Sequence, residues 1–299
     1  MNKPVTVADL PFRLLLEHRD TISAMALGGL RSVLPFKGRQ RAPQAVERTA
    51  PAPSADLLTA YRQWCQAEEL PGIPPHLVCA KITMPVEADL TAQSPYPLLS
   101  VLNQGVRLQL HHPVPEGEPI LLHGDLLDAS DDGFRARIHS RVTVGTRSVP
   151  LAMTVDAIAA VVLKKRSGGD SDKPRSEPEF VTLERWQASA SEGQTFFWLT
   201  GDFNPIHTVP ALARRTRFKG CIMHGYGAFA QVYEALQRHG ARFGEIETRF
   251  VRPLPLPSPP LLIQQANHAD EQGRIAFRLI DTAGTLYQAG HYCPLEMPA

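Results

Sequence analysis

A short run in the C-terminal half of the sequence brings a carboxylate and an imidazole close together. The run is Thr200-Gly201-Asp202-Phe203-Asn204-Pro205-Ile206-His207. Asn204 and Pro205 predict a helix start, with the asparagine as N-cap and the proline at the first helical position. His207 would lie in the first turn, where the positive end of the helix dipole disfavours the imidazolium form. Asp202, on the loop before that turn, can point to the same spot. A carboxylate and a neutral imidazole converging on one water molecule provide general acid–base chemistry.

A second segment, Phe218 to Gly227, offers a donor for an oxygen that acquires negative charge. Gly225 is expected to open a long helix, so its N–H has no intrahelical acceptor and can act as an oxyanion-hole donor. Its lack of a side chain lets a substrate carbonyl approach closely. His224 is expected to fix the entry of this helix.

Other residues of the first run are expected to support it. Gly201 supplies a tight backbone and Thr200 supports the loop by hydrogen bonding. Taken singly, Asp202 can merely cap a turn and His207 can be a structural histidine, which is the commoner fate of isolated residues of these types. Their joint spacing with Asn204-Pro205 favours catalysis.

A basic cluster follows the run. Arg214, Arg215, Arg217 and Lys219 are candidates to meet coenzyme A phosphates or the acidic face of an acyl carrier protein, Arg215 and Lys219 above all. A solvated helix face explains the same charges equally well. Pro210, between the run and this cluster, prevents the first helix from running on and begins a second one.

The elements that position these residues follow a strand pattern that occurs twice. Each half has an alternating segment, a proline-bearing bend, a short apolar segment, a turn, a further strand, a glycine turn and a last strand. The corresponding segments are 106–110, 112–115, 120–122, 131–133, 134–139, 145 and 149–163 upstream, and 248–252, 254–257, 261–263, 270–273, 274–280, 284 and a strand toward Tyr292 downstream. Antiparallel meanders resemble one another, but the recurring bend and turns favour a duplicated sheet unit.

Helical periodicity is clear in the C-terminal copy alone. The segment Gly225–Arg238 carries apolar residues at helical spacing and stops at His239-Gly240. The equivalent region of the N-terminal copy, 80–97, contains Pro85, Pro95 and Pro97, so its central helix is expected to be degenerate. The sequence therefore predicts an α+β fold of two fused units, each an antiparallel sheet wrapped around a helix.

Four regions follow from composition. Residues 1–54 form a leader that ends in an Ala/Pro-rich connector from Arg39 to Ser54, and residues 167–179 form a polar linker. Between and after them lie a non-catalytic unit at 55–166 and the catalytic unit at 180–299.

Charge and composition exclude several classes of function. Lys plus Arg number 31 and Asp plus Glu number 30, so no overall field recruits nucleic acid or an anionic membrane. The four cysteines lack zinc-site spacing and suit a reducing compartment. The apolar runs are too short or too interrupted for a signal peptide or a membrane span. We expect a soluble cytoplasmic protein.

The motif Gly201-Asp202-x-Asn204-Pro205-x-His207, followed by Ile222-x-His224-Gly225, resembles the MaoC-like, R-specific enoyl-CoA hydratases (hydratase 2) of the hotdog fold. The resemblance implies that Asp202 and His207 activate water and manage the proton at the alpha carbon. It also implies that the Gly225 N–H holds the thioester oxygen.

The resemblance extends more loosely over 55–299 and implies a double hotdog. Larger members join two hotdog units, keep the motif in the second, and use a degenerate first half as a tunnel for longer acyl chains. Tyr96-Pro97-Leu98-Leu99 also resembles a segment of such members. The chain departs at Val209, where members commonly carry an acidic or small polar residue, and we expect this to weaken a local cap or hydrogen bond rather than to remove the chemistry.

The resulting expectation is reversible hydration of trans-2-enoyl thioesters to (R)-3-hydroxyacyl thioesters carried by coenzyme A or acyl carrier protein. No metal or redox cofactor is expected, and the protein is expected to be a monomer or a homodimer. The alternatives are a hotdog acyl-thioesterase and a non-catalytic subunit that binds acyl thioesters or a carrier.

Overall fold

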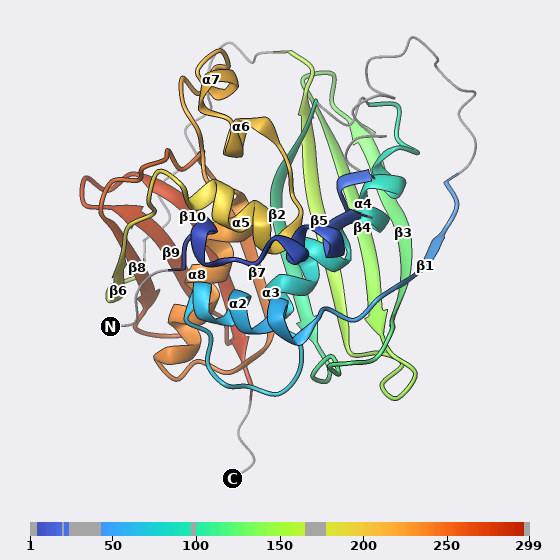
Figure 1. The fold of residues 1–299 in the computed structure, drawn as a ribbon. Coiled ribbons are helices and arrows are strands. Elements are labelled where there is room, and N and C mark those ends of the chain that lie inside the picture. The colour runs from blue at the N-terminus through green and yellow to red at the C-terminus, as the bar shows by residue number, and fades with distance from the viewer. Residues whose placement is uncertain (1–4, 20, 24–42, 97–99, 165–177, 296–299) are drawn as a thin grey trace.

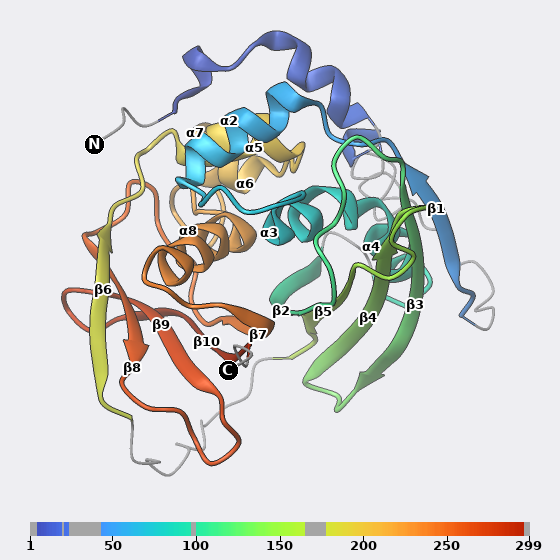
Figure 2. The same cartoon turned by 90° about the horizontal axis from the view of Figure 1, so that it is seen from below.

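The protein forms one ten-stranded antiparallel sheet with its helices on one side (Figures 1 and 2). The structure is a computed structural model that describes residues 5–19, 21–23, 43–96, 100–164 and 178–295. Most of the expected linker, Pro97-Leu98-Leu99 and the first four residues of the connector, 39–42, therefore lie outside the described residues. No helix in the described ranges is long and apolar enough to cross a membrane.

The two halves of the sheet repeat the same strand order. The strands of the first half are β1 (Val46–Ala50), β2 (Val101–Leu110), β3 (Ile120–Asp131), β4 (Arg135–Gly145) and β5 (Met153–Val162). Those of the second half are β6 (Phe180–Trp186), β7 (Phe243–Phe250), β8 (Leu261–Ala266), β9 (Ile275–Asp281) and β10 (Leu286–Pro294). The full order is β1-β3-β4-β5-β2-β7-β10-β9-β8-β6. Counted outward from the β2–β7 pair, the strands of the two halves follow in corresponding order. This correspondence supports a duplication rather than two unrelated meanders.

Alternation and close backbone contact explain these pairings. In β4 every second residue from Ala136 to Val144 is buried, as a strand with one face on a core requires. At the β2–β7 seam, a Cβ on Gly105 would lie 2.1 Å from the carbonyl oxygen of Thr248, so only glycine allows this approach. The ion pair between Arg107 and Glu245, 2.6 Å apart, also crosses the seam.

One expectation about the first half is wrong. The boundary at residue 55 leaves out β1, which lies in the expected connector and pairs with β3 from Val46 opposite Gly124 to Ala50 opposite Ile120. The segment is too short for a clear alternation, and the open edge of β3 supplies its hydrogen bonds. β1 corresponds to β6 of the second half.

The central helices differ between the halves as predicted. In the second half α8 (Gly225–Arg238) is continuous and nearly all of it is buried. In the first half the equivalent region is broken into α3 (Pro75–Leu77), the π-helical turn η3 (Val78–Ile82) and α4 (Met84–Thr91). Pro85 stands at the start of α4, where its missing N–H costs no hydrogen bond.

The remaining helices cover the central ones on the side away from the sheet. These are α2 (Ala55–Cys65), α5 (Glu192–Thr200), α6 (Pro205–Thr208) and α7 (Pro210–Ala213). The leader, with 3-10 helices η1 (Val7–Asp9) and η2 (Phe12–His18), lies outermost, across α2 and α5 (Figure 2). It is therefore packed on the same layer that carries the candidate motif.

Candidate active site

The loop that carries Asp202 begins at the C-terminal end of α5. Gly201 adopts the left-handed conformation with φ +81°, and its N–H donates to the Phe197 carbonyl at 2.7 Å. The Thr200 hydroxyl donates to the Phe196 carbonyl at 2.8 Å and accepts the Asp202 N–H at 3.3 Å. These contacts end the helix and turn Asp202 away from its axis.

His207 is oriented by α6 and by a backbone carbonyl. Asn204 caps α6, because its Oδ1 accepts the Ile206 N–H at 3.2 Å, and Pro205 is the first helical residue. His207 Nδ1 lies 2.8 Å from the Ile222 carbonyl oxygen. Since a carbonyl only accepts, Nδ1 carries the proton and Nε2 keeps a lone pair. His207 is thus set up to accept a hydrogen bond at Nε2.

His224 lies against both members of the pair. Its ring centroid is 3.9 Å from that of His207, and its Nε2 lies 3.1 Å from the Asp202 backbone oxygen. Its Nε2 is also 3.9 Å from Asp202 Oδ2. His224 is the N-cap of α8, so the expected position at the helix entry is where the structure places it. The sequence alone did not indicate its contact with the ring of His207.

Burial sets the charge states of these groups. Desolvation and the neighbouring His224 together lower the pKa of His207 to about 3, against the charge of Asp202 and the hydrogen bond to Ile222, which raise it. Desolvation lowers the pKa of His224 to about 3 as well. The pKa of Asp202 is raised by burial, which the positive form of His207 opposes. Two neutral imidazoles therefore stand beside a carboxyl group with increased proton affinity.

Gly225 is the first residue of α8, so its N–H has no acceptor within the helix. A Cβ at this position would lie 2.9 Å from two ring atoms of Phe250. The next residue, Tyr226, is buried. The pKa of Tyr226 is raised well above its usual value, first by burial and also by the charges of Glu87, Cys79 and Asp202, against a side-chain hydrogen bond with Asn103. A protonated hydroxyl near Asp202 is a donor that the sequence did not single out.

Other predicted residues lie at the surface. Arg215 and Lys219 are exposed, and among the described residues no hydrogen bond or ion pair joins either to Asp202 or His207. Val209 stands between α6 and α7 and provides no side-chain cap, as expected from its apolar side chain. Pro210 instead starts α7.

Two supporting residues were not predicted from the sequence. A Cβ on Gly193 would lie 2.1 Å from the His207 carbonyl oxygen, so this glycine lets α5 touch α6. A glycine in an otherwise helical segment is its only local indication. His18, from the leader, packs on Gly201, and nothing in the leader's sequence points to that contact.

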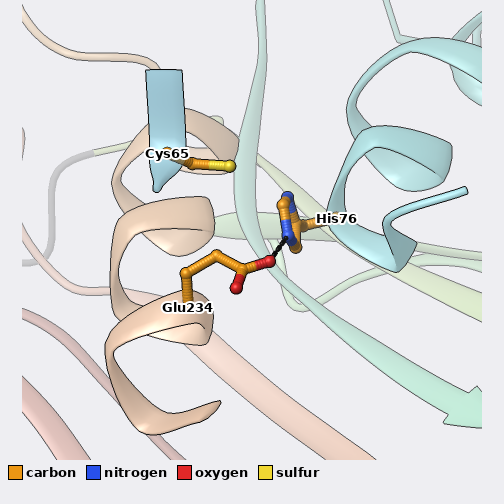
Figure 3. Close-up of side chains that lie close together, drawn as sticks. All are labelled: Cys65, His76 and Glu234. Atoms are coloured by element: carbon orange, nitrogen blue, oxygen red, sulfur yellow. Dashed lines mark hydrogen bonds and ion pairs between the residues drawn. The ribbon is translucent and has the colours of Figure 1, made fainter. Parts of the chain in front are cut away.

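A different group of side chains has ligand atoms suited to a metal ion. Cys65, His76 and Glu234 have such atoms within 4.8 Å of one another, and all three are buried (Figure 3). His76 joins the Tyr61 hydroxyl at 2.9 Å and Glu234 at 2.7 Å, and the Cys65 thiol donates to the Tyr61 carbonyl at 3.2 Å. Burial raises the pKa of Cys65, which disfavours the thiolate. We interpret the group as a hydrogen-bonded link between α2, α3 and α8.

Comparison with known proteins gives the motif a family context. The family model "MaoC like domain" matches residues 172–259, which include the run from Thr200 to His207 and Gly225. A curated relative, the peroxisomal hydratase-dehydrogenase-epimerase of Neurospora crassa, is 23% identical over 149 residues, 46% of this chain and 17% of the relative. The match thus covers less than a fifth of that multifunctional protein's length.

Solved structures share the fold over most of the chain. A MaoC-like dehydratase from Phytophthora capsici superposes with a TM-score of 0.69 at 14% identity, covering 86% of this chain and 97% of the other. A conserved Mycobacterium tuberculosis protein described as a double hotdog fold has a TM-score of 0.50 at 12% identity, covering 85% and 97%. The ten-stranded sheet and its helices therefore form a double hotdog.

Proposed function

We propose that this chain, which matches the MaoC like domain over residues 172–259 and has a double hotdog fold, adds water to, and removes it from, 2-enoyl thioesters. The observation that carries the proposal is that His224, directly before Gly225 at the start of α8, lies against the ring of His207 and the backbone oxygen of Asp202. The matched relatives support a hydratase or dehydratase broadly. The stereochemical outcome, an (R)-3-hydroxyacyl thioester, is part of the proposal.

The charge states suggest how the two side chains divide the work. The Asp202 carboxylate, whose pKa is raised, is the better proton acceptor, while neutral His207 accepts a hydrogen bond at Nε2 and orients the same water. As the water oxygen bonds to C3, its proton passes to this pair and a proton is delivered to C2. The C2–C3 double bond becomes single, and the reverse sequence releases water.

The thioester oxygen bears the charge that builds up between these two bond changes. The Gly225 N–H, at the start of a 14-residue helix, is the donor for the enolate oxygen. The Tyr226 hydroxyl, buried and uncharged, is a further donor on the same helix turn. The proposed reaction uses no metal or redox cofactor.

The first half of the chain is proposed to shape the acyl pocket. In the first half the broken central helix, α3 to α4, occupies the position that the continuous helix α8 has in the second half. The substrate carrier is coenzyme A or acyl carrier protein, and the exposed Arg215 and Lys219 offer charge for either. Because the fused halves already build one continuous sheet, a monomer and a homodimer both suffice.

The test is a spectrophotometric assay that follows loss of the enoyl absorbance with crotonyl thioesters and longer-chain analogues on both carriers. Asp202→Asn and His207→Ala should each lower kcat by about 10²–10⁴-fold, because each removes a proton-handling or orienting group. His268→Ala, at an exposed histidine, is the matched control and should keep wild-type kcat. The hydratase proposal fails if wild type and variants are equally inert on every chain length and both carriers.

The same samples separate the alternatives. Release of free thiol without loss of the double bond would identify an acyl-thioesterase. Tight binding of enoyl thioesters without any turnover would identify a non-catalytic carrier subunit.

A further inference from the structure

The leader and the first half of the chain meet the catalytic loop through one buried pair, His18 and Lys81. His18 is fully buried and Lys81 is 8% exposed, although both side chains are polar. His18 lies at the end of η2, and Lys81 lies in the π-helical turn η3 of the first half. A buried ammonium and imidazole are costly unless hydrogen-bonded, so their bonds are informative.

His18 bonds the end of the helix that precedes Asp202. Its Nε2 lies 2.8 Å from the Trp198 carbonyl oxygen. If α5 continued, that carbonyl would accept the Asp202 N–H four residues later. The Asp202 N–H instead donates to Thr200 Oγ1, so His18 replaces it at Trp198.

His18 also packs against the backbone of the loop. A Cβ on Gly201 would lie 2.6 Å from the Cβ and 2.9 Å from the Cγ of His18. Gly201 is the left-handed residue directly before Asp202. Any shift of His18 toward α5 would therefore push on the residue that sets the direction of Asp202.

Lys81 fixes the proton arrangement of His18. The Trp198 carbonyl only accepts and the Lys81 ammonium only donates, so Nε2–H is the donor and Nδ1, 2.8 Å from Lys81 Nζ, is the acceptor. Burial and the charge of Lys81 lower the pKa of His18 to about 3, which keeps this neutral tautomer. Lys81 donates to the Glu17 carbonyl at 3.0 Å as well.

The leader is itself anchored to the body of the protein. The Glu17 carboxylate accepts the Ser54 hydroxyl at 2.6 Å and the Ser54 N–H at 3.2 Å. Ser54 is the N-cap of α2. The leader is thus fixed between the start of α2 and η3 of the first half.

From these contacts we infer that His18, held by Lys81, is a positioning residue that sets the Gly201–Asp202 loop for the reaction. The inference rests on the proposed hydration, since its catalytic effect is expressed through Asp202. It assigns the non-catalytic half a role in the catalytic step: η3 supplies the cation that holds His18.

The test uses the full chain and two variants. In His18→Phe/Lys81→Met, apolar groups of similar shape replace both partners and leave no unpaired buried charge. In His18→Gln, the amide keeps an acceptor and a donor on one carbon, as Cε1 carries Nδ1 and Nε2 in histidine. We expect the double variant to fold, to lose about tenfold in kcat and to keep KM within about twofold, because the water-holding loop shifts while the Gly225 contact stays. His18→Gln should restore kcat.

A second readout does not depend on turnover. Hydrogen exchange of the amides in 199–204 should be faster in the double variant than in wild type and His18→Gln. A folded double variant with wild-type kcat overturns the inference, as does a His18→Gln variant that is as slow as the double one. If wild type hydrates no enoyl thioester, the proposed function fails, and unchanged amide exchange in the double variant would overturn the positioning role separately.

Discussion

The contact between the rings of His207 and His224 limits what either can do. Their centroids are 3.9 Å apart, so protonating one ring would place a cation against the other in a buried site. Burial lowers the pKa of each histidine to about 3, and at His207 the neighbouring His224 contributes to the lowering. In the proposed reaction the pair therefore acts through hydrogen bonds, and proton uptake is left to Asp202.

At Gly225 the absence of a side chain is a specific requirement. We expect Gly225→Ala to lower kcat/KM by about 10- to 100-fold, because the new Cβ would meet Phe250 at 2.9 Å and move either the ring or the N–H. Gly220→Ala is the matched control, since a Cβ there meets nothing within 4 Å. Steady-state kinetics of both variants decide the point, and an unchanged Gly225→Ala enzyme would remove Gly225 from the mechanism.

Among the elements, α6 shows how a four-residue helix can be placed accurately. It is too short to be stable by itself, so its position depends on its cap and its contacts. Asn204 supplies the cap, Gly193 allows α5 to approach, and the Gln194 amide donates to the Thr208 carbonyl at 3.2 Å. These three contacts place α6 and thereby orient His207.

Removing the cap should therefore affect stability and turnover together. Asn204→Ala should lower the free energy of unfolding by about 1 kcal/mol and reduce kcat, whereas Asn204→Ser should keep most of both. Denaturant unfolding and kinetics on the same preparations measure the two effects. An alanine variant that is less stable but fully active would show that the cap does not position His207.

The extent of prediction from sequence differs between local and distant contacts. The sequence predicted the features that depend on residues adjacent in the chain. These are the start of α6 at Pro205, the helix Gly225–Arg238 and the broken helix of the first half. β1 and His18 depend on partners far away, at β3 and at Trp198, and no local pattern reports such partners. The contact between His207 and His224 was missed for the same reason.

For the molecule as a whole, the buried titratable groups have opposite effects on folding stability as the pH changes. His18, His207 and His224 have pKa values lowered to about 3, so their unfolded forms bind protons first and stability falls as pH drops from 6.5 toward 3. Burial raises the pKa of Glu87 to about 7, so its folded form holds a proton first and stability rises as pH drops from 7 toward 4.5. The net curve of wild type mixes both effects.

A single substitution separates one contribution. Between pH 7.5 and 5.5, His18→Gln should lose about 1.4 kcal/mol less of its unfolding free energy than wild type, since the variant has no imidazole to protonate in the unfolded state. Denaturant unfolding at both pH values gives the difference. Parallel losses in the two proteins would mean that His18 is not held neutral in the folded state.

The repeated strand order, β1 to β5 and β6 to β10, has an evolutionary consequence. Two copies that begin as equals can specialise, and here one carries the Asp202–His207 motif while the other carries Lys81 in a distorted helix turn. Once each copy depends on the other, neither can be lost, exchanged or inherited alone. Selection then acts on the pair as one unit, and we expect lineages that vary at Lys81 to vary at His18 as well.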